Sequence, residues 1–286
     1  MPTAQEMNIT KLGIIAGSGD LPTCLVEGCL AMGIEPFIVG FHDNTDPDIL
    51  KKHPHLFTDL GKAGKVIKFF KKHDVKDLVL IGGIKRPSLR ELKPDLRGAK
   101  ILSRIGLSPM GDNTLLSLLK RELESDGLRV HGIRPFCQDL LAAEGTLGQV
   151  KPNDEDMLNI SIGIEASQMI GKLDVGQSVI IQQGLVIGIE AVEGTDALIA
   201  RCGELQKSGQ GGVLVKTMKP QQDRDLDIPT IGLDTIINAH KAGLRGIALQ
   251  ADNVLIVNPK KVAQYADQYK MFVVGVNLDD TNSQKI

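Results

Sequence analysis

Closely spaced lysines and carboxylates follow one another between Lys216 and Pro229. This segment, KTMKPQQDRDLDIP, supplies Lys216, Lys219, Asp223, Asp225 and Asp227. Its two prolines disfavour a continuous helix, so we expect an extended or looped backbone. On an extended backbone the three aspartates would point the same way and would repel one another unless a cation compensated. Mg²⁺ suits such a cluster because it bridges carboxylates and phosphates. The alternative is a solvated acidic loop interrupted by Arg224.

A second group of carboxylates lies in the sequence EAVEGTD, from Glu190 to Asp196. Helix capping explains Thr195 and Asp196. Capping does not explain Glu190, because a lone buried carboxylate at the end of an apolar strand would be costly. We therefore favour a role in a site for Glu190 or Glu193. The carboxylates of both segments, together with the lysines and Arg224 of the first, suit phosphoryl chemistry better than acyl transfer or hydride transfer.

Two glycine-containing loops follow predicted strands in the N-terminal half. The first contains Gly17, Ser18, Gly19 and Asp20. Backbone N–H groups of such a loop can approach an anion at the start of the following helix. A dinucleotide fingerprint needs a third glycine, where this chain has Pro22, and an acidic residue at the end of the next strand. Taken alone, the loop fits a structural turn as well as a ligand site, and the case for NAD is weak.

The second loop, GGIKRP, places Lys85 and Arg86 directly after a predicted strand. Open parallel sheets bind ligands beyond the carboxyl ends of their strands, so the two loops should share one edge. A Lys–Arg pair at that edge would hold a phosphate group. The alternative is a solvated basic turn.

The elements that would position these residues fall into two halves. In the first half, short runs of Val, Ile and Leu alternate with helical patterns, which is typical of a parallel sheet covered on both faces. We expect strands at 11–16, 35–41, 77–84 and 128–133 and helices at 21–32, 64–72 and 112–125. This pattern predicts a Rossmann-like α/β domain over residues 1–145, followed by a linker at 145–153.

The second half, residues 146–286, predicts another α/β domain, with a mixed sheet and the catalytic residues. We expect helices at 154–170, from 196 and at 233–242, and strands at 212–218 and 271–276. The run QSVIIQQGLVIGIE is broken at Gln183 and Gly184, which predicts a hairpin over 177–190. A second hairpin is predicted over 246–258, with its turn at 251–253.

Composition argues against several classes of function. A net charge of −2 and an aromatic content of 3% disfavour nucleic-acid binding. No apolar run is long enough to span a bilayer, and the polar start lacks the layout of a signal peptide, so we expect a cytoplasmic protein. The four cysteines form no C-x-x-C pair, and no G-x-S-x-G or H-E-x-x-H motif occurs. Neither a zinc site nor a nucleophilic Ser or Cys is therefore expected.

Several of these segments together resemble the LpxI family. The similar stretches are GIIAGSGDLP, IGGIKRP, GDNTLL, EAVEGTDALI, KPQQDRDLDIPTIG and FVVGV, in this order from about Leu12 to Val276. The resemblance implies an enzyme of lipid A biosynthesis in Gram-negative bacteria that depends on Mg²⁺ or another divalent cation such as Mn²⁺. It would hydrolyse UDP-2,3-diacylglucosamine to UMP and 2,3-diacylglucosamine 1-phosphate (lipid X), with water attacking the α-phosphorus. Two domains would hold the acylated sugar phosphate between them.

The resemblance also implies an essential aspartate within 223–227. The family usually has arginine where this chain has Asp225, so Asp223 and Asp227 are the better candidates. We predict that these two, with Glu190 or Glu193, bind the metal and activate water. Lys216 and Lys219 would stabilise charge on the phosphoryl oxygens. The predicted substrate-binding residues are Gly17, Ser18, Gly19, Asp20, Lys85, Arg86, Gly194 and Thr195.

Two other functions stay open. A non-catalytic nucleotide-sugar or lipid-sugar binding protein would use the same loops without needing the carboxylates. An NAD-dependent oxidoreductase is suggested by the Rossmann-like half. Because the substrate is a two-chain amphiphile, a peripheral contact with the inner membrane is compatible with the sequence, although no basic amphipathic helix marks its place. The oligomeric state, including a homodimer, is left open.

Overall fold

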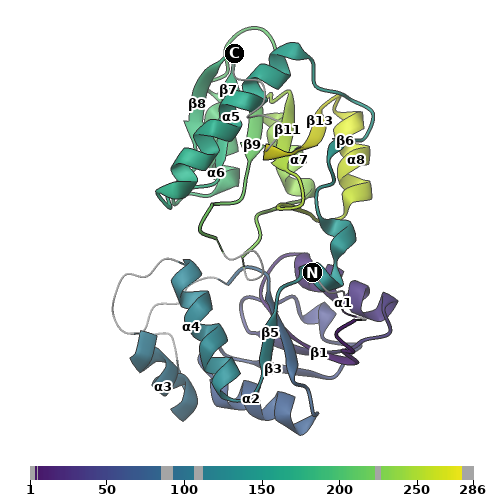
Figure 1. The fold of residues 1–286 in the computed structure, drawn as a ribbon, viewed down its shortest axis with the longest axis vertical. Coiled ribbons are helices and arrows are strands. Elements are labelled where there is room, and N and C mark those ends of the chain that lie inside the picture. Colours follow the sequence, from purple (N-terminus) through teal and green to yellow (C-terminus); the bar gives the residue numbers. More distant parts are fainter. Residues whose placement is uncertain (1–3, 5, 85–92, 106–111, 223–226, 279–286) are drawn as a thin grey trace. The chain divides into compact units, whose positions relative to one another are not determined.

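The computed structural model describes residues 4, 6–84, 93–105, 112–222 and 227–278. These residues divide into an N-terminal unit that ends at Gln138 and a C-terminal unit that begins at Asp139 (Figure 1). Each unit has buried hydrophobic clusters of its own. Among the described helices, none has the length and apolar character that crossing a membrane requires.

The N-terminal unit is built on a five-stranded parallel sheet with the order β3-β2-β1-β4-β5. Its strands are β1 (Lys11–Ala16), β2 (Glu35–Phe41), β3 (His55–Thr58), β4 (Asp77–Ile81) and β5 (Arg129–His131). Its helices are α1 (Leu21–Ala31), α2 (Ala63–Lys72), α3 (Leu96–Ile105) and α4 (Asp112–Ser125), with 3-10 turns η1 (Pro47–Ile49) and η2 (Arg134–Phe136). The all-parallel sheet with its crossover helices confirms the predicted Rossmann-like half.

Buried apolar side chains attach the helices to this sheet. Phe70 of α2 is fully buried and clusters with Val39 of β2 and Leu78 of β4. Helix α1 contacts β1 and β2. The strand order reverses between β1 and β4, because β2 and β3 extend the sheet to one side and β4 and β5 to the other. Open α/β sheets bind ligands at this reversal, beyond the carboxyl ends of the strands.

The C-terminal unit contains a six-stranded sheet with the order β6-β13-β11-β9-β7-β8. Its strands are β6 (Gly145–Leu147), β7 (Ser178–Gln182), β8 (Leu185–Ile189), β9 (Val213–Lys216), β11 (Gly246–Gln250) and β13 (Phe272–Val276). A separate two-stranded sheet joins β10 (Thr230–Ile231) and β12 (Leu255–Ile256). The helices are α5 (Asp154–Lys172), α6 (Thr195–Gly203), α7 (Leu233–Lys241) and α8 (Pro259–Gln268), and η3 (Gln138–Leu140) is a 3-10 turn.

Strand directions in this sheet are mixed. Strands β9, β11 and β13 are parallel, whereas β6, β7 and β8 each run antiparallel to their neighbours. The predicted mixed sheet is therefore confirmed. The predicted 177–190 hairpin is β7–β8, and its two loop residues, Gln183 and Gly184, have φ angles of 53° and 75°. Positive φ at both positions is what a two-residue turn of type I′ requires.

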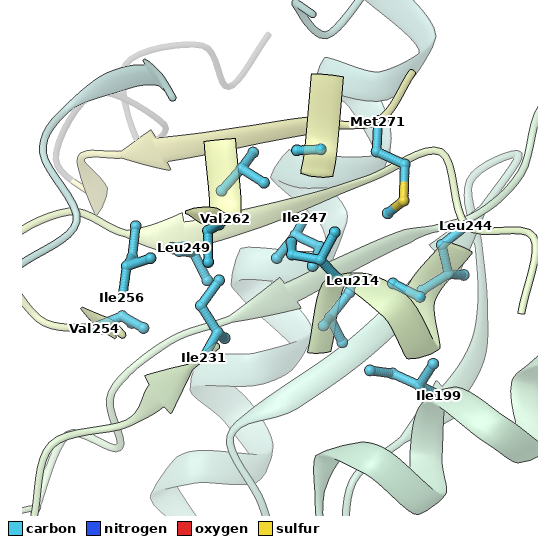
Figure 2. Close-up of a cluster of buried hydrophobic side chains, with 14 of the residues drawn as sticks. Ile199, Leu214, Ile231, Leu244, Ile247, Leu249, Val254, Ile256, Val262 and Met271 are labelled. Carbon is cyan, nitrogen blue, oxygen red and sulfur yellow. The ribbon is translucent and has the colours of Figure 1, made fainter. Parts of the chain in front are cut away.

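Alternation along the strands sorts side chains onto the two faces of the sheet. Leu214 of β9 lies in the cluster that includes residues of α6, α7 and α8 (Figure 2). Its neighbours Val213 and Val215 lie in the cluster that includes residues of α5. The last residue of β9, Lys216, therefore falls on the same face as Leu214, the face that carries α6.

The predicted hairpin over 246–258 is wrong. Asp252 does turn the chain, with φ 56°. However, β11 lies between β9 and β13 and is parallel to both, and β12 pairs instead with β10. A strand has two hydrogen-bonding edges, and distant segments already occupy both edges of β11. Local apolar patterning does not reveal such partners.

The segment 145–153, predicted as a linker, is in part a strand. Gly145–Leu147 form β6, which pairs antiparallel with β13, so this stretch belongs to the sheet of the C-terminal unit. The predicted boundary at 145/146 falls within β6. Elements β3, α3 and β10 were not predicted, and the two strands have only four and two residues.

Candidate functional site

Lys216 is buried at the carboxyl end of β9, on the face that carries α6. Only 6% of its surface is exposed. Ser178 of β7 lies directly opposite it in the antiparallel pair. The strands thus direct a charged side chain into the interior, where a lysine is rarely found without a partner.

A chain of hydrogen bonds links Lys216 to a buried carboxylate. Lys216 Nζ donates to Thr195 Oγ1 over 2.9 Å, and Thr195 Oγ1 donates to Glu190 Oε1 over 2.7 Å. The other oxygen, Glu190 Oε2, accepts the backbone N–H of Gln177 over 3.1 Å. Because an ammonium group can only donate, the Thr195 hydroxyl must give its proton to Glu190.

The start of α6 places Thr195 in this network. Gly194 has φ 82° and ψ 170°, a conformation that glycine adopts without strain, and Thr195 is the first residue of the helix. The first N–H groups of a helix have no partner within it and favour an anion. The site thus combines an ammonium group with a helix N-terminus.

The surroundings act on the charge of Lys216 in two opposing ways. Burial lowers the pKa of Lys216 below its ordinary value, because a charged group loses its hydration in the interior. Attraction to Glu190, Asp196 and Asp227 opposes this shift. Among the described residues that act on the charge of Lys216, these three carboxylates and one ammonium carry a formal surplus of two negative charges.

Asp227 is held by a neighbouring amide. Gln222 Nε2 donates to Asp227 Oδ2 over 2.6 Å, and Gln222 Oε1 accepts the backbone N–H of Lys219 over 3.2 Å. Gln222 is 6% exposed. Within the described part of the chain, this amide is the one hydrogen-bond partner of Asp227, and Oδ1 is left available.

Two of the predicted site residues have other partners. Glu193 accepts hydrogen bonds from Arg201 and from the backbone N–H of Ala191. The pKa of its carboxyl group is lowered, first by its own backbone N–H and then by the hydrogen bond from Arg201. Lys219 forms an ion pair with Asp174, with 2.7 Å between Nζ and Oδ1. The structure therefore brings Lys216, Thr195 and Glu190 together, whereas Glu193 and Lys219 serve separate contacts.

A metal ligand set is incomplete among the residues that the structure describes. No three His, Cys, Asp or Glu side chains of these residues gather closely enough to hold an ion. Both oxygens of Glu190 accept hydrogen bonds, whereas Asp227 Oδ1 has no hydrogen-bond partner among the residues that the structure describes. Mg²⁺ is commonly held by one or two carboxylates together with substrate phosphates and water, so Asp227 fits this mode.

In the N-terminal unit, the first glycine loop packs against the loop that follows β4. The N–H of Ser18 donates to the carbonyl of Gly83, and the N–H of Gly83 donates back to Ser18. A Cβ on Gly17 would lie 2.3 Å from the Gly83 carbonyl oxygen, so glycine is required for this approach. Gly17 thus has a structural role, while Gly19, with φ 89°, has open space beside its Cα.

Three predicted site residues, Asp223, Lys85 and Arg86, lie outside the described residues. Asp20 precedes α1 at its N-cap, without a capping hydrogen bond from its side chain. Gln222 and Ser178 were not predicted from the sequence. Gln222 precedes the predicted Asp223. Its burial could not be predicted, because it lies in a run of polar residues that shows no pattern of buried positions.

Two domain models of one family match this chain. The models of the LpxI N-terminal domain and the LpxI C-terminal domain match residues 11–140 and 143–274. A relative from Caulobacter vibrioides, UDP-2,3-diacylglucosamine pyrophosphatase LpxI, is 36% identical over 274 residues. The match covers 93% of this chain and 98% of the relative.

Solved structures give a weaker comparison. A biotin carboxylase domain of a thermophilic 2-oxoglutarate carboxylase matches 60% of this chain and 34% of its own, with 8% identity and a TM-score of 0.26. The corresponding domain from Hydrogenobacter thermophilus matches 62% and 35%, with 9% identity and a TM-score of 0.24. These scores are too low to bear on fold or function.

Proposed function

This chain belongs to the LpxI family, and on that premise we propose that it hydrolyses the pyrophosphate of UDP-2,3-diacylglucosamine in lipid A biosynthesis. The products would be UMP and 2,3-diacylglucosamine 1-phosphate. The observation that carries this proposal is the buried Lys216–Thr195–Glu190 network at the start of α6. An ammonium group beside a helix N-terminus suits the diphosphate of this substrate, because both attract anions.

Lys216 is proposed to bind the substrate's phosphoryl oxygens. Thr195 is its one hydrogen-bond partner among the described residues, so two of its three donors are available. The N–H groups at the start of α6 would add further donors. Donors that are already in place stabilise the charge that develops on a phosphoryl group without having to reorganise.

Asp227 is proposed to hold the attacking water and the metal. The surplus of negative charge around Lys216 supports a requirement for a divalent cation, because the substrate's diphosphate would otherwise be repelled. Asp227 Oδ1 would be one ligand, and Asp223, which the sequence analysis predicts, would be a second. A bound Mg²⁺ would screen the phosphate charge and lower the pKa of water.

The proposed reaction is a single displacement at the α-phosphorus. Asp227 takes a proton from the water as its oxygen bonds to phosphorus. The bond from the α-phosphorus to the bridging oxygen breaks, and the β-phosphate leaves with the diacylated sugar. Lys216 and the start of α6 hold the phosphoryl oxygens during this exchange.

Product analysis tests the proposed function. Purified protein incubated with UDP-2,3-diacylglucosamine and Mg²⁺ should release UMP and the diacylated sugar phosphate in equal amounts, as measured by mass spectrometry. An Asp227→Asn variant should bind the substrate but form product at least about 100-fold more slowly. Tight binding by the wild-type protein without any product would favour a binding protein instead.

The NAD-dependent alternative has no specific observation in its favour. Gly17 is occupied by its contact with the loop after β4, and Pro22 in α1 stands where the fingerprint needs glycine. The parallel sheet alone does not identify a cofactor, because one fold supports many functions.

A peripheral contact with the inner membrane and a homodimer are further proposals. Strand β8 is an edge of its sheet and exposes Leu185, Val186 and Ile189. Natural proteins usually cover or charge such apolar edges. Sedimentation with phospholipid vesicles would test the membrane contact, and sedimentation velocity without lipid would test the dimer.

A further inference from the structure

Gln222 links the backbone of Lys219, shortly after β9, to the carboxylate of Asp227. Its Oε1 accepts the N–H of Lys219 at 3.2 Å, and its Nε2 donates to Asp227 Oδ2 at 2.6 Å. The side chain is nearly closed to solvent, with 6% of the residue exposed. Both ends of a buried amide are thus satisfied by partners that lie within the same segment.

The two contacts fix which way the amide points. A backbone N–H can only donate, so the oxygen of Gln222 must face Lys219. The Gln222 NH₂ group must then face Asp227, where it donates to Oδ2. Asp227 therefore meets a donor on one oxygen, while Oδ1 has no partner within the described part of the chain.

We propose that Gln222 is a positioning residue that orients the carboxylate of Asp227, so that Oδ1 faces the reacting groups. This inference rests on the proposed role of Asp227 in pyrophosphate hydrolysis. Hydrogen-bonding partners of a ligating carboxylate typically contribute 10- to 100-fold to activity or metal affinity. The backbone around Lys219 is also held from other sides, because Met218 N donates to Gln250 Oε1 and Gln168 Nε2 donates to the Met218 carbonyl. Loss of the Gln222 contacts should therefore affect Asp227 more than the fold.

The test is a Gln222→Met variant of the full chain, which keeps the length of the side chain but removes the donor. With UDP-2,3-diacylglucosamine and Mg²⁺, kcat should fall about 10- to 100-fold while KM changes less than about threefold. Gln221→Met is the matched control. Gln221 is its exposed neighbour and donates to the Gly171 carbonyl, so this variant should keep wild-type kcat. If Gln222→Met does not fold, Gln222→Asn, which is too short to reach both partners, replaces it.

A double variant separates positioning from a general structural role. If Gln222 acts through Asp227, then Gln222→Met combined with Asp227→Asn should be no slower than Asp227→Asn alone. Multiplied losses, or a wild-type kcat in folded Gln222→Met, would overturn the inference. Wild-type activity in Asp227→Asn would instead overturn the proposed role of Asp227, so the two failures are distinguishable.

Discussion

Lys216 carries a charge into a part of the C-terminal unit that is almost closed to water. Its only described hydrogen-bond partner is Thr195, and three carboxylates lie close enough to influence its pKa. A buried charge with unused donors is costly unless a ligand takes part. A functional role would explain why a charged lysine is buried here, whereas a contribution to stability would not.

A change of pH should reveal the charge on Lys216. Burial lowers its pKa below the ordinary value of 10.5, although nearby carboxylates oppose the shift. The protonated form donates to phosphate, so kcat/KM should fall as pH rises through this lowered pKa. A pH–rate profile of the wild type should thus show an alkaline limb below pH 10.5. Lys216→Arg should lose that limb because a guanidinium stays protonated there; an unchanged limb would contradict the assignment.

The hydroxyl of Thr195 should matter more than its shape. Thr195→Val keeps the volume but removes both the acceptor for Lys216 and the donor to Glu190. Hydrogen bonds to charged groups contribute about 1.5–3 kcal/mol, so kcat/KM should fall roughly 10- to 100-fold. Thr195→Ser should stay within about threefold of wild type. A near wild-type rate in Thr195→Val together with a loss in Thr195→Ser would show that the methyl group, and not the hydroxyl, is what the site needs.

Sequence reasoning located part of this site for a physical reason. Glu190 stood out because a carboxylate at the end of an apolar strand needs a partner, and the structure supplies Thr195 and the N–H of Gln177. Charge alone could not distinguish Lys216 from Lys219. Their different partners depend on the backbone, because Lys216 is the last residue of β9 and Lys219 lies beyond the strand.

At the scale of elements, two loops of the N-terminal unit meet at the reversal of strand order. Gly17 and Gly82 leave no room for a side chain, because a Cβ on either residue would lie within 3 Å of the other loop's backbone. The backbone bonds between Ser18 and Gly83 hold the loops together. The glycine-rich loop that suggested a nucleotide site therefore also serves to pack the two loops together.

Gly17→Ala should destabilise the N-terminal unit. The new Cβ would lie 2.3 Å from a backbone oxygen that cannot move cheaply. Such overpacking costs about 1–3 kcal/mol, which urea unfolding would detect. Gly19→Ala in the same loop meets open space and bears only the strain of φ 89°, about 1–2 kcal/mol. A Gly17→Ala variant as stable as the wild type would show that the two loops separate easily.

Local patterns predicted elements better than their pairing. The hairpin β7–β8 was predictable because its turn residues and its partner strands are adjacent in sequence. The partners of β11 were not predictable, since β9 and β13 come from distant segments. The short strand β3 has only four residues, too few for a distinct pattern.

Over the whole molecule, the two units differ in the kind of sheet they contain. The N-terminal unit offers the carboxyl edge of a parallel sheet, whereas the C-terminal unit offers Lys216, Thr195, Glu190 and Asp227. The predicted fold class, two α/β units of which one has a mixed sheet, is confirmed. Parallel and mixed sheets were distinguishable because βαβ alternation in the first half gives way to a hairpin in the second.

Hydrolysis in ¹⁸O-labelled water tests whether the protein is a hydrolase and which phosphorus the water attacks. The purified protein would be incubated with UDP-2,3-diacylglucosamine in the presence of either Mg²⁺ or a chelator. The masses of both products would be measured by mass spectrometry. We expect one ¹⁸O atom in UMP, none in the diacylated sugar phosphate, and no reaction in the presence of the chelator. Label in the sugar phosphate would contradict attack at the α-phosphorus, and a folded protein that forms no product with any divalent cation would contradict the hydrolase itself.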